Sequence, residues 1–345
     1  MTTMTTTDRK KRSVLVIGAG GFTGGFIADE GLRRGYEVWA GVRHSTSRRY
    51  LVDERLQFAE IDFSDGESIR KSLGATLEAK GSPWDYIIYN LGATKCLNFS
   101  DFNRINHDYL DQTIKALKAL DAVPEKFLFV SSLSVMGRGD EKGYTPFRED
   151  MVPNPNTRYG TSKLKAELAL QASGIPHIIV RATGIYGPRE KDYYLMFKSI
   201  KRHVDFSVGF RRQELTFIYV EDLARAFYDA LERSATPALY LLSENRSYSQ
   251  KEFRAIAQKA MGTRCVVPVK APLWVLKAVS SIAGRIGRMQ GKPSTLNPDK
   301  YNIMRQRNWK ADTTKAREGF GFDPRTSLEE GVSKTVAWYR SEGWL

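Results

Sequence analysis

A cluster of glycines directly follows the first apolar run of the chain, and it constrains the fold more than any other feature. Residues 14–17 read Val-Leu-Val-Ile, residues 18–24 read Gly-Ala-Gly-Gly-Phe-Thr-Gly, and an apolar helix-like stretch begins at Phe26. Glycines let the backbone turn tightly, so that a pyrophosphate reaches the unpaired N–H groups of a helix N-terminus. The pattern predicts a strand–turn–helix unit that binds a dinucleotide through Gly18, Gly21, Phe22, Thr23 and Gly24.

Short apolar runs and helix-like stretches alternate along the first half of the chain. Residues 102–120 are one such stretch, with Ile105, Tyr109 and Leu117 at helical spacing. This alternation predicts an α/β fold: a Rossmann-type, doubly wound parallel sheet, followed by a smaller, mostly helical C-terminal substrate lobe. The expected strands are Val14–Ile17, Glu37–Val42, Gln57–Ile61, Tyr86–Asn90, Phe127–Ser131, His177–Arg181 and Leu239–Leu242.

The same pattern predicts how the chain is divided. Residues 1–12 are expected to be a flexible N-terminus, and residues 327–345 a C-terminal helix. The dinucleotide-binding domain is expected over 13–188, with later strands from about 213–245 completing its sheet. The substrate-binding lobe then consists of 189–212 and 246–326.

Composition indicates the cellular compartment in which the protein is expected. The two cysteines, Cys96 and Cys265, are far apart and form no disulfide framework, which favours a reducing compartment. Residues 1–12 lack the apolar core of a signal peptide, and no uninterrupted apolar stretch approaches the roughly 18 residues that span a membrane. The expected location is therefore the cytoplasm, and no metal site is predicted.

The positive charge is concentrated in one segment. The net charge is +14, and residues 264–310 carry ten Lys or Arg against one acid, Asp299. Such a segment meets nucleic acid, an anionic membrane or an acidic substrate, or is simply a solvated surface. A nucleic-acid partner is not expected, because no recognition motif accompanies the charge.

Tyr159 and Lys163 are spaced four residues apart in a helix-like stretch, so both project from one face. A nearby ammonium is expected to lower the pKa of the phenol, which would make Tyr159 a general acid for a carbonyl oxygen. The serines of 131–134 follow the strand Phe127–Val130, at the edge of a parallel sheet where ligands bind. The alternative is an ordinary amphipathic helix beside a polar loop.

Five motifs occur in order along the chain: Gly18-x-x-Gly21-x-x-Gly24, Ser131-Ser132-x-x-Val135-x-Gly137, Tyr159-Gly-x-Ser-Lys163, Arg181-x-x-Gly184-Ile185-Tyr186-Gly187-Pro188 and Phe217-Ile218-Tyr219-Val220-Glu221-Asp222. A chain with these blocks resembles the extended short-chain dehydrogenase/reductases, the NAD-dependent epimerase/dehydratase family. The resemblance implies a homodimer formed through the helices that carry Asn106 and Tyr159.

The resemblance also assigns roles to individual residues. It implies that Tyr159 is the catalytic acid/base, that Lys163 holds the nicotinamide ribose, and that Ser132 orients the substrate oxygen. Asn106 is implied to support Lys163 through water, while Asp222 is expected to cap a helix instead of taking part in catalysis. Further cofactor contacts are implied at Asp62, Phe63, Leu91, Gly92, Ala182 and Ile185.

Basic residues after the second strand favour NADP(H) over NAD(H). In NAD-binding members this strand tends to end in an acid, whereas here Arg43 follows it, with Arg48 and Arg49 close behind. A guanidinium attracts the 2′-phosphate that a carboxylate repels. The alternative is that Arg43 only stacks on adenine.

Departures from the family pattern indicate a hydrophobic substrate. Met136 stands where sugar-nucleotide enzymes have a tyrosine, Gly184 where they have an asparagine, and Leu215 where they often have an arginine for the diphosphate. We therefore expect a keto-lipid reductase, or the reverse dehydrogenase, acting on a 3-keto sphingoid base or a steroid, as in the 3β-hydroxysteroid dehydrogenase-like branch. A sugar-nucleotide epimerase, dehydratase or reductase is the alternative, with Arg211 and Arg212 as its anion site; a non-catalytic NADP-binding sensor is the third. Candidate substrate contacts are Thr94, Lys95, Ser134, Met136 and Trp274.

A basic amphipathic stretch lies within 272–289. Val275, Val279, Ile282, Ile286 and Met289 share one helical face, and Lys277, Arg285 and Arg288 lie on the other side. Two alternatives stay open at this point. Either the apolar face packs on the substrate lobe, or it docks on the inner face of a membrane.

Overall fold

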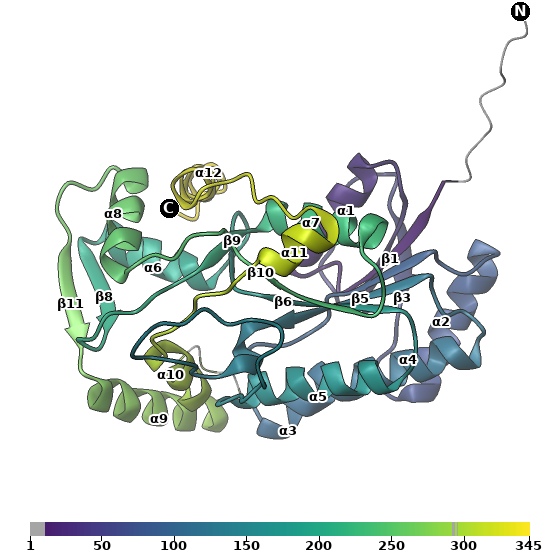
Figure 1. Ribbon diagram of the computed structural model, residues 1–345, viewed down its shortest axis with the longest axis horizontal. Coiled ribbons are helices and arrows are strands. Elements are labelled where there is room, and N and C mark those ends of the chain that lie inside the picture. The colour runs from purple at the N-terminus through teal and green to yellow at the C-terminus, as the bar shows by residue number, and fades with distance from the viewer. Residues whose placement is uncertain (1–10, 292–293, 295) are drawn as a thin grey trace, which may run out of the picture.

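The computed structural model describes residues 11–291, 294 and 296–345. Its centre is a seven-stranded, wholly parallel sheet in the order β10-β6-β5-β4-β1-β2-β3 (Figure 1). This confirms the predicted doubly wound parallel sheet. The strands are β1 (Ser13–Ile17), β2 (Glu37–Val42), β3 (Gln57–Glu60), β4 (Tyr86–Tyr89), β5 (Lys126–Ser132), β6 (His177–Ala182) and β10 (Ala238–Leu242).

Helices cover both faces of this sheet, as Figure 1 shows. Val14 and Val16 of β1 pack into one apolar cluster, whereas Leu15 and Ile17 pack into another on the opposite face. Because both faces are buried, the inner strands consist mostly of apolar residues, whereas β3 at the edge of the sheet reads Gln-Phe-Ala-Glu and is exposed at both ends. The first face is covered by α1 (Phe22–Arg33), α7 (Val220–Arg233) and α11 (Thr314–Phe320), and the second by α2 (Gly66–Lys80), α4 (Tyr109–Ala119) and α5 (Arg158–Ala172).

The predicted helix over 102–120 is interrupted. Helix α3 (Phe99–Asn103) is followed by a π-helical turn, Arg104–Asp108, before α4 begins. A π-helical turn adds one residue to each hydrogen-bonded turn of the helix and is frequently found at functional sites. Periodicity alone does not reveal this turn, because the apolar spacing of the flanking helices continues through it.

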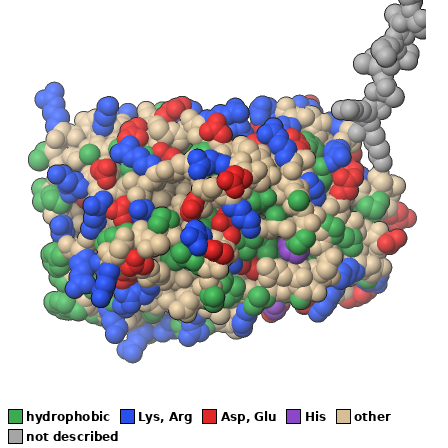
Figure 2. All heavy atoms as spheres, in the orientation of Figure 1, with side chains coloured by type: hydrophobic (Ala, Val, Ile, Leu, Met, Phe, Trp, Pro, Cys, Tyr) green, Lys and Arg blue, Asp and Glu red, His purple; other side chains and the backbone are tan. Residues whose placement is uncertain are grey.

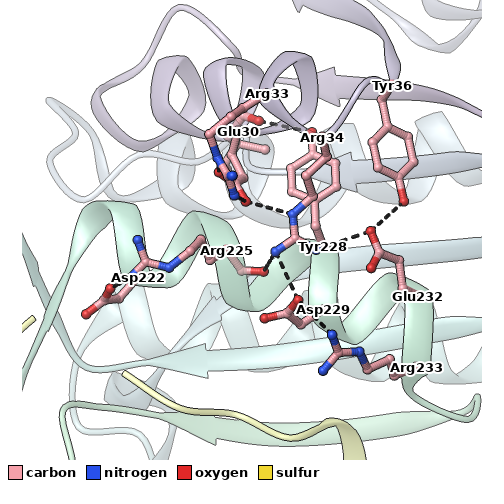
Figure 3. Close-up of polar contacts among 11 residues, drawn as sticks. Glu30, Arg33, Arg34, Tyr36, Asp222, Arg225, Tyr228, Asp229, Glu232 and Arg233 are labelled. Atoms are coloured by element: carbon pink, nitrogen blue, oxygen red, sulfur yellow. Dashed lines mark hydrogen bonds and ion pairs between the residues drawn. The ribbon is translucent and has the colours of Figure 1, made fainter. Parts of the chain in front are cut away.

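Ion pairs connect α1 to α7 across the first face (Figure 3). Arg34, at the C-terminal end of α1, forms ion pairs with Glu30 of its own helix and with Asp229 and Glu232 of α7. The Tyr36 hydroxyl donates a second hydrogen bond to Glu232, at 2.9 Å. These contacts hold the helix that begins at the glycine turn against the rest of the domain.

Asp222 does not cap α7, so that prediction was wrong. Tyr219 is the N-cap residue, and Asp222 lies in the first turn. Its buried carboxylate accepts hydrogen bonds from the Thr326 amide at 2.7 Å and the Thr326 hydroxyl at 3.2 Å. Asp222 therefore anchors the segment that leads into α12 (Leu328–Ser341).

The remaining elements form a second, mainly helical region. Of the strands expected within 213–245, only β10 joins the main sheet, since β9 (Phe217–Tyr219) pairs with β7 (Gly184–Tyr186). A second two-stranded ribbon is formed by β8 (Val204–Val208) and β11 (Val267–Ala271). The helices of this region are α6 (Asp192–Lys201), α8 (Gln250–Met261), α9 (Leu273–Met289) and α10 (Pro298–Arg305).

The expected flexible N-terminus, residues 1–12, lies only partly within the described part of the chain. Residues 1–10 lie outside the described part of the chain. Arg12, expected within a flexible terminus, forms an ion pair with Glu125 at 3.2 Å, and its carbonyl accepts a hydrogen bond from the Glu37 amide. Among the described residues, no helix has both the length and the apolar character needed to cross a membrane.

Candidate active site

The glycine turn brings backbone atoms too close together for side chains. Gly18 has a φ of 87°, and a Cβ built there would lie 2.8 Å from the Leu91 amide nitrogen. A Cβ at Gly24 would overlap the Gly18 carbonyl oxygen. Gly21 is the N-cap of α1, and no side chain caps that end of the helix. The turn therefore fits a pyrophosphate, because bare backbone and free helix amides lie at its mouth.

The two other residues expected in this turn contribute to packing. Phe22 begins α1 and its ring meets Phe26 edge-on, with the centroids 6.1 Å apart. Thr23 is buried. Their side chains support the first turn of α1, while its backbone amides remain at the N-terminus of the helix.

Lys163 lies next to the strand edge and is buried. Its Nζ donates a 2.8 Å hydrogen bond to the Val130 carbonyl and lies 4.6 Å from the centre of the Phe129 ring. A Cβ at Gly92 would lie 3.1 Å from the Lys163 Nζ, so the residue after Leu91 touches this lysine. Only two residues of the loop after β4, Leu91 and Gly92, therefore lie between the glycine turn and Lys163 in space.

The Tyr159 phenol is not made acidic by Lys163 in this structure, which corrects the expectation from spacing. Burial raises the pKa of Tyr159 above its ordinary value, and the only opposing effect is a hydrogen bond with the Ser132 hydroxyl. Burial also lowers the pKa of Lys163, to about 8. The phenol is therefore protonated at neutral pH and ready to donate its proton.

Ser132 lies at the C-terminal end of β5, with its hydroxyl directed to the loop that follows. Its Oγ accepts a hydrogen bond from the Ser134 amide at 3.2 Å and donates one to the Ser134 Oγ at 3.1 Å. Together with its bond to Tyr159, this places the hydroxyls of Ser132, Ser134 and Tyr159 in one cluster. Such a cluster can hold a carbonyl or alcohol oxygen.

Asn106 lies in the π-helical turn and is fully buried. Its Nδ2 donates to the Ser162 hydroxyl at 2.9 Å and to the Ala93 carbonyl at 3.1 Å, and its Oδ1 accepts from the Ala93 amide at 2.7 Å. A Cβ at Gly92 would lie 3.1 Å from the Asn106 Oδ1. Asn106 therefore fixes the loop that touches Lys163.

Three residues that support the site were not identified from the sequence as doing so. Asp299 of α10 accepts hydrogen bonds from the amides of Arg158 and Tyr159, at 3.1 and 3.0 Å. Glu167 and Arg181 form a buried ion pair at 2.7 Å, and Glu167 also accepts a hydrogen bond from the Ser131 hydroxyl. The periodicity of α5 places Glu167 on its inner face, but no local signal points to Asp299.

The basic residues after β2 lie at the surface. The Arg43 side chain is exposed and forms no hydrogen bond or ion pair with another described residue. Arg48 stacks on Phe58, 4.2 Å from the ring centre, and lies 3.7 Å from Glu60. Of this pair, only Arg43 keeps its guanidinium available for a phosphate.

The remaining expected cofactor contacts lie along the ends of the strands. The Asp62 carboxylate accepts hydrogen bonds from the Ser64 amide and hydroxyl, while Phe63 packs on Tyr109 within the core. Leu91 and Gly92 follow β4, Ala182 ends β6 and Ile185 lies in β7. Because the parallel strands of the main sheet end at one edge, Asp62, Leu91, Gly92 and Ala182 lie at the edge that carries the glycine turn, while Ile185 belongs to the separate pair of β7 and β9.

The candidate substrate residues do not form one group. Thr94 is exposed, and Lys95 forms an ion pair with Asp192, which also binds Lys300 at 3.2 Å. Ser134 belongs to the hydroxyl cluster described above. Trp274 lies on α9 and is 74% exposed, and it lines neither of the two cavities described below.

Met136 is buried, and its sulfur lies 3.1 Å from the Arg181 guanidinium. It also contributes to a cavity of about 350 Å³ with a mixed lining of Met136, Arg138, Gly139, Phe147, Met151, Val152, Asn154 and Asn156. The lining therefore contains polar groups beside the apolar ones expected for a hydrophobic substrate. A much smaller cavity, about 20 Å³, lies between the α3 region and α9–α10.

Among the described residues, no group of three or more His, Cys, Asp or Glu side chains lies close enough to hold a metal ion.

Comparisons with known proteins agree with this arrangement. The model of the NAD dependent epimerase/dehydratase family matches residues 14–242. Over 96% of both chains, the protein is 25% identical to a ceramide reductase of Caulobacter vibrioides. It is 24% identical to a UDP-glucose 4-epimerase of Vibrio cholerae, over 96% of this chain and 97% of that one.

A solved structure shows the same fold. The UDP-glucose 4-epimerase of Thermotoga maritima, determined with UDP-glucose, superposes with a TM-score of 0.75 at 20% identity, covering 96% of this chain and 99% of that chain. The family match over most of the chain, and the enzymes among its relatives, favour an enzyme over the non-catalytic sensor. The chain is an enzyme of the NAD dependent epimerase/dehydratase family, an extended short-chain dehydrogenase/reductase that acts on CH–OH and C=O groups.

Proposed function

We propose that this enzyme transfers a hydride between a nicotinamide dinucleotide and a carbon bearing a hydroxyl or keto group, with Tyr159 exchanging the proton. One observation carries the proposal. The loop after β4 touches the glycine turn through Leu91 and touches Lys163 and Asn106 through Gly92. The turn that fits the pyrophosphate is thereby adjacent to the acid/base helix.

The chain's own residues supply the proton chemistry. In reduction, the Tyr159 hydroxyl donates its proton to the substrate oxygen as the carbonyl carbon receives the hydride, and in oxidation the phenolate takes that proton back. The Ser132 hydroxyl holds the same oxygen. When bound, the nicotinamide supplies or accepts the hydride. Lys163, held by the Val130 carbonyl, contacts Gly92 in the loop that connects to the turn.

NADP(H) is the cofactor that Arg43 favours. Its guanidinium follows β2, is exposed and has no described partner, which leaves it available for a 2′-phosphate. Similar structures, including a dTDP-glucose 4,6-dehydratase of Bacillus anthracis, were solved with NAD. Titrating the enzyme with NADPH and with NADH, with dissociation constants as the readout, tests the preference.

A sugar nucleotide is the substrate class that the comparisons support better. Named relatives include the UDP-glucose 4-epimerase of Vibrio cholerae and a human dTDP-D-glucose 4,6-dehydratase, the latter 26% identical over 64% of this chain and 58% of that one. Within this chain, Asn154, Asn156 and Arg138 supply polar groups to the 350 Å³ cavity. That volume is within the range of small-molecule sites.

A keto lipid is the second candidate, and a specific observation favours it. Leu215 replaces the diphosphate-binding arginine expected in sugar-nucleotide enzymes; its side chain packs on the apolar cluster of the second region, and its backbone pairs with Tyr248. Arg211 and Arg212 were the alternative anion site. Arg212 already forms an ion pair with Glu214, whereas Arg211 forms none with a described residue. The ceramide reductase relative and the 3β-hydroxysteroid dehydrogenase-like branch belong to this second candidate.

One experiment separates the two candidates. The enzyme is incubated with NADPH and a panel of 3-keto sphingoid bases, ceramide-type ketones, keto-steroids and small aldehydes, and nicotinamide absorbance is followed. In parallel, the melting temperature is measured with UDP-, GDP- and dTDP-sugars. Stabilisation by a sugar nucleotide without turnover of any apolar ketone supports the first candidate, and the reverse result supports the second.

Tyr159→Phe serves as the control in the absorbance arm, where consumption of NADPH is the readout. Consumption of NADPH that persists in this variant would contradict the proposed role of the phenol, whichever substrate is used.

A homodimer through α4 and α5 also stays a proposal. Leu168 on α5 is more than half exposed, and sedimentation analysis of Leu168→Glu tests whether this helix forms the dimer interface.

A further inference from the structure

Helix α9 presents its apolar face to solvent. Val279, Ile282, Ile286 and Met289 are between 46% and 86% exposed, and Trp274 near the helix start is 74% exposed. The alternative in which this face packs on the substrate lobe was therefore wrong. Large apolar side chains grouped in this way on a monomer mark an interaction surface.

The opposite side of α9 explains this orientation. Its buried residues are Leu276 and the small residues Ser280, Gly284 and Gly287. A Cβ at Gly284 would lie only 3.2 Å from the Pro298 Cδ at the start of α10. The helix thus packs on α10 through its small residues, which leaves the larger apolar ones unpartnered.

The ribbon of β8 and β11 extends the exposed apolar surface. Phe206 is 66% exposed and is paired in register with Val269, while Val267 on the same side is 57% exposed. Strand β11 leads through Pro272 directly into α9, and a Cβ at Gly209 would lie 3.7 Å from Leu273. We call this continuous surface, formed by the outer sides of β8, β11 and α9, the docking face.

Cations flank the docking face. Arg264, Lys270, Lys277, Arg285 and Arg288 are exposed, and none of the five forms an ion pair with a described residue. Figure 2 shows blue and green side chains gathered at the lower left, over the region where Figure 1 labels β11 and α9. On α9, Lys277, Arg285 and Arg288 are exposed on a different side of the helix from the apolar residues, and none of them belongs to its buried side.

We propose that the docking face binds the surface of an anionic phospholipid bilayer, with α9 lying in the plane of the interface. The apolar side chains enter the boundary between headgroups and acyl chains, and the unpaired cations contact the phosphates. Long Lys and Arg side chains are suited to this position, because their stems stay apolar while their charges reach the headgroups. Charge selects this occupant over a second copy, since two docking faces would bring like charges together.

The docking face is connected to the active site through α10. Gly284 of α9 lies against Pro298, and the next residue, Asp299, binds the amides that begin α5. The membrane-facing helix therefore lies one contact away from the helix that carries Tyr159. Membrane binding is measured directly in the experiment below, independently of turnover.

Vesicle co-sedimentation tests the proposal. Full-length protein is mixed with vesicles of phosphatidylglycerol and phosphatidylcholine, or of phosphatidylcholine alone, at low and high salt. We expect binding to the anionic vesicles that weakens with salt. Ile282→Glu/Ile286→Glu should lower the partition coefficient about tenfold or more, because two carboxylates enter the apolar face. The matched control is Val52→Glu/Val123→Glu, which adds the same charge at exposed apolar positions outside the docking face.

A second variant keeps the test independent of folding. Lys277→Glu/Arg285→Glu should reduce binding to anionic vesicles about tenfold while leaving the melting temperature unchanged, because both side chains are exposed. Equal binding to both vesicle types, or unchanged binding of both double variants, would overturn the proposal. A wild-type dimer that dissociates only in Ile282→Glu/Ile286→Glu, without vesicle binding, would assign the face to a second copy and also overturn it.

Discussion

The Nζ atom of Lys163 donates a hydrogen bond to the Val130 carbonyl, 2.8 Å away, within a buried site at the end of β5. The lysine is thus oriented by a strand end and not by the phenol four residues before it. Burial lowers the pKa of Lys163 to about 8, so this cation is costly to keep charged at neutral pH. A measurable pH dependence of stability follows.

The free energy of unfolding should rise from pH 7 to pH 9.5 in the native protein relative to Lys163→Met. The folded pKa lies near 8 and the unfolded value near 10.5, so the unfolded chain binds more protons in this window and stability increases with pH. The expected difference is about 2 kcal/mol. Urea unfolding of both proteins at the two pH values measures it, and parallel curves would contradict the lowered pKa.

Tyr159→Phe should lower turnover by roughly two to four orders of magnitude, because general acid catalysis typically contributes that much. The fold and the cofactor affinity should be retained, since the ring stays in place and only the hydroxyl bonded to Ser132 is lost. Steady-state kinetics and dinucleotide titration give the two readouts. Near-normal turnover would rule out the phenol as the proton donor.

Two glycine substitutions in the turn should behave differently. In Gly24→Ala the added Cβ meets the Gly18 carbonyl and the Ala19 Cα, so we expect a loss of about 1–3 kcal/mol in stability. In Gly21→Ala the nearest atom is 3.3 Å away and φ is −77°, so the fold should persist. Dinucleotide affinity should fall about tenfold or more in both. Thermal melts and dinucleotide titrations compare the two variants. Gly174→Ala is unsuitable as a control, because the φ of Gly174 is positive and alanine would be strained there.

Arg43→Ala should weaken NADPH binding roughly 10- to 100-fold and leave NADH binding nearly unchanged, because only NADPH carries the 2′-phosphate. Arg48→Ala is the matched control, since Arg48 already stacks on Phe58 and lies near Glu60. Fluorescence titration of the two cofactors provides the measurement. Equal losses for NADH and NADPH would show that Arg43 contacts the shared adenosine portion.

Asp299→Ala should destabilise the protein by about 1–2 kcal/mol and reduce turnover, because the amides of Arg158 and Tyr159 lose their acceptor at the start of α5. Asp323→Ala is the control, because it removes an exposed carboxylate outside α10. It should change neither stability nor turnover. Melting curves and kinetics of both variants make the comparison. If turnover is unaffected in Asp299→Ala, α10 does not position the acid/base helix.

Much of the fold could be predicted because its signals are local. The seven strands of the main sheet occur within one or two residues of their expected bounds, since a strand buried on both faces must be a short apolar run. The glycine turn was predictable for a similar reason, as close backbone contacts exclude side chains at Gly18 and Gly24. By contrast, the π-helical turn that holds Asn106 has no local signature in the apolar spacing.

The sequence by itself determined the strand order in the chain, the tight turn after β1 and the presence of a tyrosine and a lysine on one helical face, because each depends on neighbours a few residues apart. Only the tertiary structure decided that Asp299 binds the start of α5, that Lys163 turns to Val130, that Asp222 anchors Thr326, and that α9 faces solvent. These outcomes depend on which surfaces meet after folding. Contacts between residues 33 to 141 positions apart leave no trace in periodicity or spacing.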